Sequence, residues 1–224
     1  MTTYPLAWRH GERNTVYAVD GSEYTGEWRK DLRHGHGVEI WANGDRYEGE
    51  FEDDMRQGRG TFWRMVIVDS DGQVVEAKAA EEAAARGETA GIEELFLEYS
   101  GGWLADARHG LGTRYWPSGN VYEGEWAHGR RSGWGTMVYA ADGLRYEGEW
   151  RDDERSGFGK AFFANGDVFE GSWSHDVKDG PGRWYFVSKN KMLEGEWLED
   201  AAQCGVVVDI ELSDNPAEAK FGIP

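Results

Sequence analysis

The sequence predicts an all-β protein, an elongated, twisted, single-layer antiparallel sheet of consecutive β-hairpins with a short Ala-rich helix in an insertion. Three observations predict this fold. A Tyr-x-Gly-x-Trp unit recurs along the chain, a pair of glycines follows each unit at a fixed distance, and turn-forming dipeptides separate the units. The segments between turns alternate aromatic or β-branched residues with polar ones, which is the period of a half-buried strand.

The central glycine of each unit defines position 0 of the repeat. It falls at Gly26, Gly49, Gly101, Gly124, Gly148, Gly171 and Gly195, in steps of 23, 52, 23, 24, 23 and 24 residues. The long step corresponds to one repeat with an insertion. The sequence therefore predicts seven hairpins over residues 22–212, preceded by an N-terminal segment with a degenerate repeat strand (1–21) and followed by a C-terminal tail (213–224).

A second glycine pair recurs at positions +9 and +11. Its members are Gly35 and Gly37, Gly58 and Gly60, Gly110 and Gly112, Gly133 and Gly135, Gly157 and Gly159, and Gly180 and Gly182. The seventh unit has Cys204 and Val206 at these positions, so we expect its hairpin to replace glycine with bulk and to close the array.

Dipeptides that favour positive φ angles separate the units and predict tight hairpin turns. They are Asn43-Gly44, Ser118-Gly119, Asp142-Gly143 and Asn165-Gly166. Asp20-Gly21 precedes the first full unit, which makes "TVYAVDG" the second strand of a degenerate leading repeat.

The insertion, about residues 64–92, has a different composition. Its first part, "RMVIVDSDGQVV", is expected to extend a hairpin around Asp71-Gly72. Its second part, "EAKAAEEAAARG", favours a helix that ends at Gly87. We interpret the insertion as a lateral ornament, because loops between repeats tolerate added residues.

Strand alternation assigns the two faces of the sheet. Tyr122, Gly124 and Trp126 fall on one face, and Glu123 and Glu125 on the other. A glycine without a side chain leaves a bay in which a neighbouring ring can lie flat. Glycine costs a strand about 0.5–1 kcal/mol relative to alanine, whereas burial of an aromatic ring contributes several kcal/mol, so packing should prevail.

The other face is expected to be acidic. It carries Glu27, Glu48, Glu50, Glu123, Glu125, Glu147, Glu149, Glu170, Glu194 and Glu196. A basic residue recurs at position +7, namely Arg33, Arg56, Arg108, Arg131, Arg155 and Lys178. We expect these cations to approach the acidic rows and to balance their charge, since exposed ion pairs contribute only about 0–1 kcal/mol each.

Composition and charge argue against several functions. The formal net charge of −18 opposes binding to nucleic acid or to anionic lipid, so no nucleic acid partner is expected and a membrane partner is disfavoured. A single cysteine, Cys204, is compatible with a reducing compartment, and we expect a soluble protein of the cytoplasm. We expect no cofactor, metal or catalytic residue and no enzyme activity, because His34 and His36 have no second ligand pair and the glutamates are regular rather than an isolated acid/base pair.

The aromatic residues divide into two sets by repeat position. The first set is expected to pack within the sheet and comprises Tyr24, Trp28, Tyr47, Phe51, Tyr99, Trp103, Tyr122, Trp126, Tyr146, Trp150, Phe169, Trp173 and Trp197. The second set lies later on the second strand and is expected to form a groove for a partner; it comprises Trp41, Phe62, Trp116, Met137, Tyr139, Phe163, Trp184 and Phe186. Direct partner contact by rings of the first set stays open as an alternative.

The units "YTGEWRKDLRHGHG", "YEGEWAHGRRSGWG" and "YEGEWRDDERSGFG" resemble MORN repeats, over residues 17 to about 210 apart from the insertion. The resemblance implies a twisted hairpin sheet used as a scaffold, with relatives in the axonemes of motile cilia and flagella, including radial spokes, and others at the cell cortex. It implies a structural adaptor of the cytoskeleton that grips a peptide or helix of an axonemal protein, such as a basic spoke-base protein. The alternative that it implies is a phosphoinositide-binding membrane module at the cortex.

Overall fold

The computed structural model describes residues 9–75, 82–83, 85–86 and 91–210. The chain divides into two compact units, Met1–Pro117 and Ser118–Pro224, and each is described by itself. In both units the strands are antiparallel and follow one another in chain order, as expected of consecutive hairpins.

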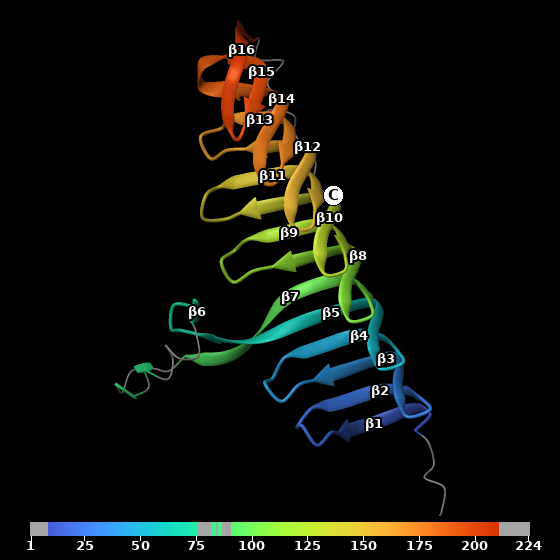
Figure 1. Ribbon diagram of the computed structural model, residues 1–224. Helices are drawn as coiled ribbons and strands as arrows, with labels where there is room; N and C mark the ends of the chain where they lie inside the picture. The colour runs from blue at the N-terminus through green and yellow to red at the C-terminus, as the bar shows by residue number, and fades with distance from the viewer. Residues whose placement is uncertain (1–8, 76–81, 84, 87–90, 211–224) are drawn as a thin grey trace, which may run out of the picture. The chain divides into compact units, whose positions relative to one another are not determined.

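The first unit is one open sheet with the strand order β1-β2-β3-β4-β5-β7-β8 (Figure 1). Its strands are β1 (Gly11–Tyr17), β2 (Glu23–Arg29), β3 (Leu32–Ile40), β4 (Arg46–Glu52), β5 (Met55–Val68), β6 (Val74–Val75), β7 (Ile92–Leu104) and β8 (Ala107–Tyr115). The short strand β6 pairs only with β5.

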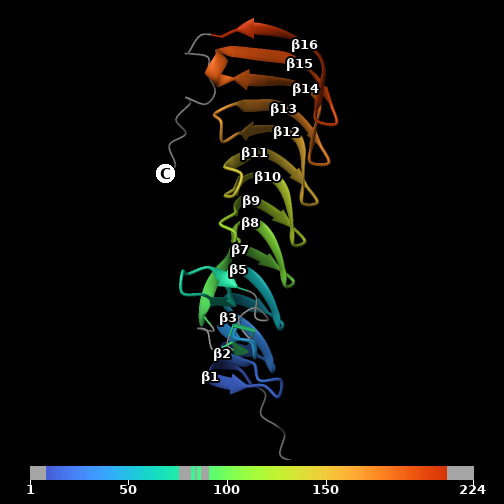
Figure 2. The same cartoon turned by 90° about the vertical axis from the view of Figure 1, so that its left-hand side faces the viewer.

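The second unit is also one open sheet, in which neighbouring strands in the chain are neighbours in space (Figure 2). Its elements are β9 (Val121–Ala127), β10 (Arg130–Tyr139), β11 (Leu144–Arg151), β12 (Glu154–Phe162), β13 (Val168–Ser174), β14 (Val177–Phe186), the 3₁₀ turn η1 (Val187–Lys189), β15 (Lys191–Leu198) and β16 (Ala201–Asp209). The predicted fold class, an antiparallel sheet of consecutive hairpins, is confirmed.

The insertion extends one hairpin, as predicted. Strands β5 and β7 pair as far as Val68 and Ile92, and they continue past the neighbouring hairpins in Figure 1. A turn closed by hydrogen bonds between Asp69 and Gln73 leads into β6, which pairs back onto β5. The predicted Ala-rich helix covers residues 76–87, of which 76–81, 84 and 87 lie outside the described part of the chain; Glu82, Ala83 and Ala85 are helical.

Two kinds of hairpin turn alternate along the chain. Within each repeat, the residues at positions +4 and +5 both have positive φ, which defines a type I′ turn. These pairs are Lys30-Asp31, Asp53-Asp54, Ala105-Asp106, His128-Gly129, Asp152-Asp153, His175-Asp176 and Glu199-Asp200. In the predicted Asn43-Gly44 turn only the glycine has positive φ (84°), and Gly44 N–H donates to the carbonyl of Trp41. The dipeptides between repeats are therefore turns, but their first residue does not adopt the positive φ that we expected.

The two ends of the array differ from the central repeats. Strand β1 pairs with β2 as the predicted leading half-repeat, and Gly11 has the positive φ (76°) of a position +9 glycine. At the other end, Gly205 lies opposite Gly195, as the position +11 glycine lies opposite the position 0 glycine in the other repeats. Gly205 comes ten residues after position 0, one residue earlier than in those repeats. Because the hairpin is one residue shorter, the prediction that Val206 replaces the position +11 glycine is wrong, whereas the position +9 glycine is replaced by a larger residue, Gln203 rather than Cys204.

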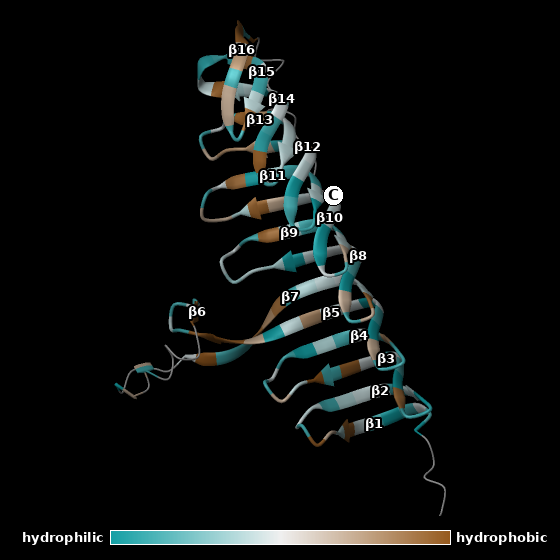
Figure 3. Ribbon diagram, in the orientation of Figure 1, coloured by the Kyte–Doolittle hydropathy of each residue, from teal (hydrophilic) through white to brown (hydrophobic). Residues whose placement is uncertain are grey.

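Hydrophobic and hydrophilic residues are interleaved along the strands rather than collected in separate elements (Figure 3). This is the pattern expected when one face of a sheet buries its own side chains and the other face does not. The core of each unit therefore lies on one face of its sheet.

Candidate partner-binding surface

A ladder of buried rings occupies one face of each sheet. Each predicted packing ring is at most 7% exposed: Tyr24, Trp28, Tyr47, Phe51, Tyr99, Trp103, Tyr122, Trp126, Tyr146, Trp150, Phe169, Trp173 and Trp197. The rings meet edge to face rather than flat; Tyr146, for example, contacts Trp150 of its own repeat and Trp173 of the next at centroid distances of 5.2 and 5.3 Å. Tyr24, Tyr47, Tyr122 and Tyr146 each join two successive repeats in this way.

Hydrogen bonds satisfy most polar atoms of the ladder, whereas the indole N–H of Trp28 is buried without a partner among the described residues. The Tyr122 hydroxyl donates to the Glu125 carbonyl at 3.0 Å, and the Trp150 indole N–H donates to the Gly135 carbonyl at 3.3 Å. Burial raises the pKa of Tyr24 and of Tyr99 to about 12. Burial also raises the pKa values of Tyr47, Tyr122 and Tyr146. The ladder therefore favours neutral phenols, since a buried phenolate would lose its hydration.

Two of the three glycine columns make room for the rings, as predicted. A Cβ at Gly135 would lie 2.3 Å from the Tyr122 hydroxyl oxygen, and one at Gly124 would lie 2.5 Å from the Gly135 Cα. Position +9 is different. Gly133 has a φ of +63°, and a Cβ there would lie 2.6 Å from the Glu125 carboxyl carbon. The position +9 glycine therefore serves the backbone conformation and a carboxylate contact, not a ring.

The cations at position +7 lie on the aromatic face, which corrects the prediction that they balance the acidic rows. Arg131 donates through its N–H and Nε to the Asp153 carboxylate at 3.0 Å, and through Nη2 to the Asp153 carbonyl at 2.6 Å. Its guanidinium lies 4.1 Å from the centroid of the Trp150 ring. Because Asp153 and Trp150 belong to the following repeat, the arginine clamps two repeats together.

The same clamp recurs in both units. Position +7, or its equivalent in the leading strand, pairs with the position +5 aspartate of the next repeat in Arg9–Asp31, Arg33–Asp54, Arg56–Asp106, Arg131–Asp153, Arg155–Asp176 and Lys178–Asp200. Sequence reasoning missed these aspartates. Their recurrence five residues after position 0 was the available signal.

The predicted groove residues lie on the same face, mostly beyond the buried ladder. Trp41, Phe62, Trp116, Tyr139, Phe163, Trp184 and Phe186 are of intermediate exposure, whereas Met137 is 4% exposed and lies between Tyr122 and Tyr146. We call the seven intermediate residues the outer rings. Among them, Phe163 and Trp184 stack at 4.9 Å, and Trp184 and Phe186 at 6.1 Å.

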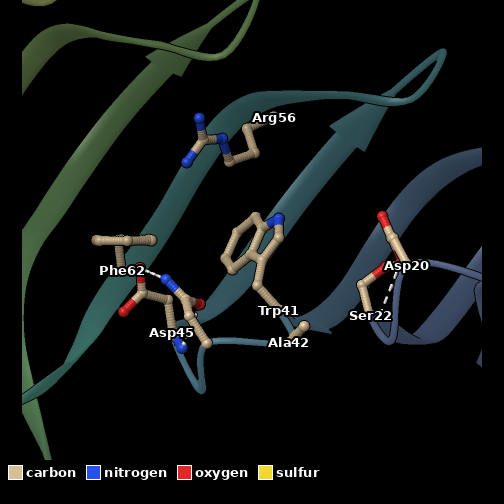
Figure 4. Close-up of a pocket in the computed structure, with 8 residues that line it drawn as sticks. Asp20, Ser22, Trp41, Ala42, Asp45, Arg56 and Phe62 are labelled. Carbon is tan, nitrogen blue, oxygen red and sulfur yellow. Dashed lines mark hydrogen bonds between the residues drawn. The ribbon is translucent and has the colours of Figure 1, made fainter.

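In the first unit, Trp41 and Phe62 line a shallow hollow of about 500 Å³ (Figure 4). Their rings lie 5.8 Å apart, and the carboxylates of Asp20 and Asp45 stand at its edge. Arg56 also lines the hollow, with its guanidinium held by Asp106. The hollow thus combines apolar walls with anionic edges.

Two carboxylates that pair with arginines are buried in the first unit. Glu39 is 8% exposed, and it accepts a hydrogen bond from Arg33. Burial raises the pKa of Glu39, and Arg33 opposes that rise. Glu98, at a bulge of β7, is 7% exposed and pairs with Arg64 at 2.6 Å and with Arg114 at 3.0 Å. At the repeat position of Glu39, the second unit has Met137, Ala161 and Trp184.

The acidic face carries a regular hydrogen bond. The position +1 carboxylate accepts the N–H of the residue at position +10, as in Glu27 with His36, Glu50 with Arg59, Glu125 with Trp134, and Glu149 with Phe158. The glutamates at position −1, which we call the outer glutamates, pair instead with cations of the same face, as in Arg145–Glu147, Lys160–Glu170 and Arg183–Glu194.

Among the residues that the structure describes, no three His, Cys, Asp or Glu side chains are grouped so as to hold a metal ion. Likewise, the described residues contain no helix with the length and apolar character needed to span a membrane.

Repeated hairpins, a buried Tyr–Trp ladder and paired glycines define a protein of the repeat-scaffold class. The family description "MORN repeat" matches residues 24–46, 47–64, 99–121, 122–143, 146–168 and 169–191, more than half of the chain. The chain therefore belongs to the MORN repeat family, whose members are typically scaffold or adaptor proteins.

One relative and one solved structure illustrate the likeness. MORN repeat-containing protein 3 from Xenopus laevis is 39% identical over 110 residues, which cover 49% of this chain and 37% of that protein. A catalytically inactive virginiamycin B lyase from Staphylococcus aureus with quinupristin is 12% identical, covers 92% of this chain and 72% of its own, and has a TM-score of 0.17. A score that low carries no structural argument.

Proposed function

We propose that this protein is a non-enzymatic adaptor that holds a peptide or helix of another protein against its outer rings, in the axoneme of motile cilia or flagella. The outer rings carry the proposal. The ladder already joins the repeats through buried Tyr–Trp contacts, so rings of intermediate exposure beside it provide apolar surface beyond what the sheet needs.

The chemistry of the partner follows from charge. The chain has a net charge of −18, and carboxylates of Asp20 and Asp45 border the Trp41–Phe62 hollow. A basic segment with apolar anchors complements such a surface, whereas the acidic surface of a microtubule does not. We therefore propose a basic spoke-base or adaptor protein as the partner, and the axonemal setting follows from the family resemblance.

The alternative, a phosphoinositide module, requires available cations. The repeated basic residues at position +7 are engaged by aspartates and stacked on rings, as Arg155 is by Asp176 and Trp173. These ion pairs and ring contacts weaken this alternative, because anionic headgroups bind basic side chains that are free to face them.

The experiment compares the wild-type chain with a Tyr139→Ala/Phe163→Ala double variant in pull-downs from isolated cilia, followed by mass spectrometry. We expect the wild type to retain a specific basic protein and the variant to lose at least nine-tenths of it, since outer rings act as anchors. Near-ultraviolet circular dichroism checks that the variant keeps its ring ladder. Equal retention by a folded variant rejects the assignment, and salt-sensitive binding of the wild type to phosphoinositide vesicles would favour the alternative.

A further inference from the structure

The acidic face of the second unit carries a row of exposed apolar residues that the ladder does not use. Position +10 holds Trp134 on β10, Phe158 on β12 and Pro181 on β14. Trp134 is 51% exposed and Phe158 is 42% exposed, and Pro181 is also exposed. In the first unit the same position holds His36 and Arg59, with Leu111 at its last repeat.

Carboxylates alternate with these side chains. Trp134 lies opposite Glu149, Phe158 opposite Ser172, and Pro181 opposite Glu196 in the strand register. Because paired residues of antiparallel strands share a face, the apolar and acidic groups lie side by side.

The glutamates at position +1, which we call the inner glutamates, have no cationic partner in this row. Within the described residues, Glu125 and Glu149 accept only backbone N–H groups, and Glu196 makes no ion pair. Three outer glutamates, Glu147, Glu170 and Glu194, already pair with Arg145, Lys160 and Arg183. The row therefore offers uncompensated negative charge next to exposed rings.

The sixth repeat opens a hollow within the row. Ser172 stands where the other three repeats of the second unit have a glutamate, and Pro181 has no N–H for such a glutamate to accept. The missing side chain leaves a hollow of about 450 Å³ between Phe158 and Pro181, bordered by Glu196. Arg183 also lines this hollow and is paired with Glu194, while the lining residue Glu170 is paired with Lys160.

The spacing of the row fits one backbone conformation. Successive position +10 residues are two strands apart, which is about 9.6 Å for strands that lie about 4.8 Å apart. Three residues of a polyproline II helix rise about 9.3 Å, so every third residue meets an equivalent site along the row. Aromatic rows of this kind bind polyproline II segments in other proteins.

We propose that the row of Trp134, Phe158 and Pro181, with Glu125, Glu149 and Glu196, is a second docking surface, for a basic polyproline II segment of a partner protein. Prolines of the segment pack against the rings and the hollow, and an arginine or lysine at every third residue pairs with the inner glutamates. This surface lies on the face opposite the outer rings, so it is independent of the proposed adaptor site.

The test measures fluorescence anisotropy of a labelled (Arg-Pro-Pro)4 peptide with the full chain. We expect saturable binding, and Trp134→Thr and Phe158→Thr should each raise the Kd at least tenfold because each removes one ring of the row. Threonine suits a strand, and both residues lie outside the ladder, so both variants should fold. Leu111→Thr, at the same repeat position in the first unit, is the matched control and should leave the Kd within twofold.

Further arms separate this surface from charge alone and from self-association. Glu149→Gln/Glu196→Gln should raise the Kd about fivefold, and (Asp-Pro-Pro)4 should not bind. Equal affinity for (Arg-Gly-Ser)4, an unchanged Kd in the folded ring variants, or no binding by the wild type would each overturn the proposal. So would a wild-type dimer in sedimentation that the Trp134→Thr variant loses while the peptide fails to compete. Tyr139→Ala/Phe163→Ala should bind the peptide normally, which distinguishes this surface from the adaptor site.

Discussion

Position +13 of the repeat carries Glu39, Phe62 and Arg114 in the first unit and Met137, Ala161 and Trp184 in the second. Position +10 differs as well: it is His36, Arg59 and Leu111 in the first unit, and Trp134, Phe158 and Pro181 in the second. The ladder tyrosines, paired glycines and arginine clamps are shared by both units. The difference teaches that the shared positions build the sheet, whereas the variable positions give each unit its own surface chemistry.

The largest expected effect lies at the position +11 glycine. A Cβ at Gly60 or at Gly135 would stand 2.2 or 2.3 Å from a ladder tyrosine oxygen, so Gly60→Ala and Gly135→Ala should each cost about 3 kcal/mol or more of unfolding free energy. Urea denaturation of the full chain measures both. Gly129→Ala, where a Cβ meets nothing within 4 Å but φ is +83°, is the control and should cost about 1 kcal/mol. A small loss in only one unit would break the equivalence of the two ladders.

The arginine clamp should contribute alike to both units. Arg56→Ala and Arg131→Ala each remove charge-assisted hydrogen bonds to an aspartate and a guanidinium stacked on a tryptophan, at 4.4 and 4.1 Å respectively. We expect a loss of about 2–3 kcal/mol for each in urea denaturation.

Arg130→Ala controls for charge alone. Arg130 pairs with Asp152, and both side chains are more than 60% exposed, so its loss should cost about 0–1 kcal/mol. A loss at Arg131 no greater than that at Arg130 would show that the clamp is an ordinary surface ion pair.

Exchanging position +13 between the units should give effects of different size. Met137→Glu places a carboxylate at a site that is 4% exposed, and we expect it to cost about 2 kcal/mol, with Arg131 the nearest possible partner. Glu39→Met removes a buried carboxylate whose pKa is raised by burial, and Arg33 retains its ion pair with Asp54. This variant should therefore change the free energy of unfolding by no more than about 1 kcal/mol in either direction. Thermal denaturation of both variants tests this; a large loss for Glu39→Met would mean that the first unit depends on its ion pairs.

The smallest expected effect is a difference in the pH dependence of stability between Tyr99 and the phenylalanine at the same repeat position in the second unit. Burial raises the pKa of Tyr99 from 10.0 to about 12, so the stability contributed by its neutral phenol is complete below about pH 10 and falls as the pH rises toward 12. Phe169 occupies the equivalent position and does not titrate.

Tyr99→Phe should cost about 1 kcal/mol at neutral pH, since it loses the hydrogen bond to the Gly102 carbonyl. Between pH 10 and pH 11 the wild type should lose up to about 1.4 kcal/mol more unfolding free energy than the Tyr99→Phe variant. Denaturation midpoints measured from pH 8 to pH 11.5 test both statements, and an identical pH dependence in variant and wild type would contradict the burial of the Tyr99 phenol.

Much of the fold could be predicted because the glycines and rings recur with one period. The alternation that places Tyr122 and Trp126 opposite Glu123 depends only on strand geometry. The edge-to-face arrangement of the rings could not be predicted, because it depends on how neighbouring hairpins twist and pack. The role of Gly133 was also hidden, since glycine makes room for a ring and adopts positive φ equally well.

The candidate site was predictable only in part. The outer rings were assigned from the alternation of side chains along the second strand of each repeat. Alternation alone did not separate Met137 from the outer rings, although the two flanking tyrosines bury it. The clamp by Asp153 was missed because its partner, Arg131, is 22 residues away in sequence and meets it only after the repeats stack. The Trp134 row was missed because a regular pattern of glutamates dominates the same face.

The most direct test of the adaptor assignment replaces Phe163 by a photo-crosslinking phenylalanine derivative in the full chain and, in a matched sample, replaces the ladder residue Phe169. Irradiation in isolated cilia should join a single basic polypeptide to position 163 and nothing to position 169. Crosslinks to the same polypeptide from both positions, or crosslinks from position 163 to tubulin alone, would contradict the account.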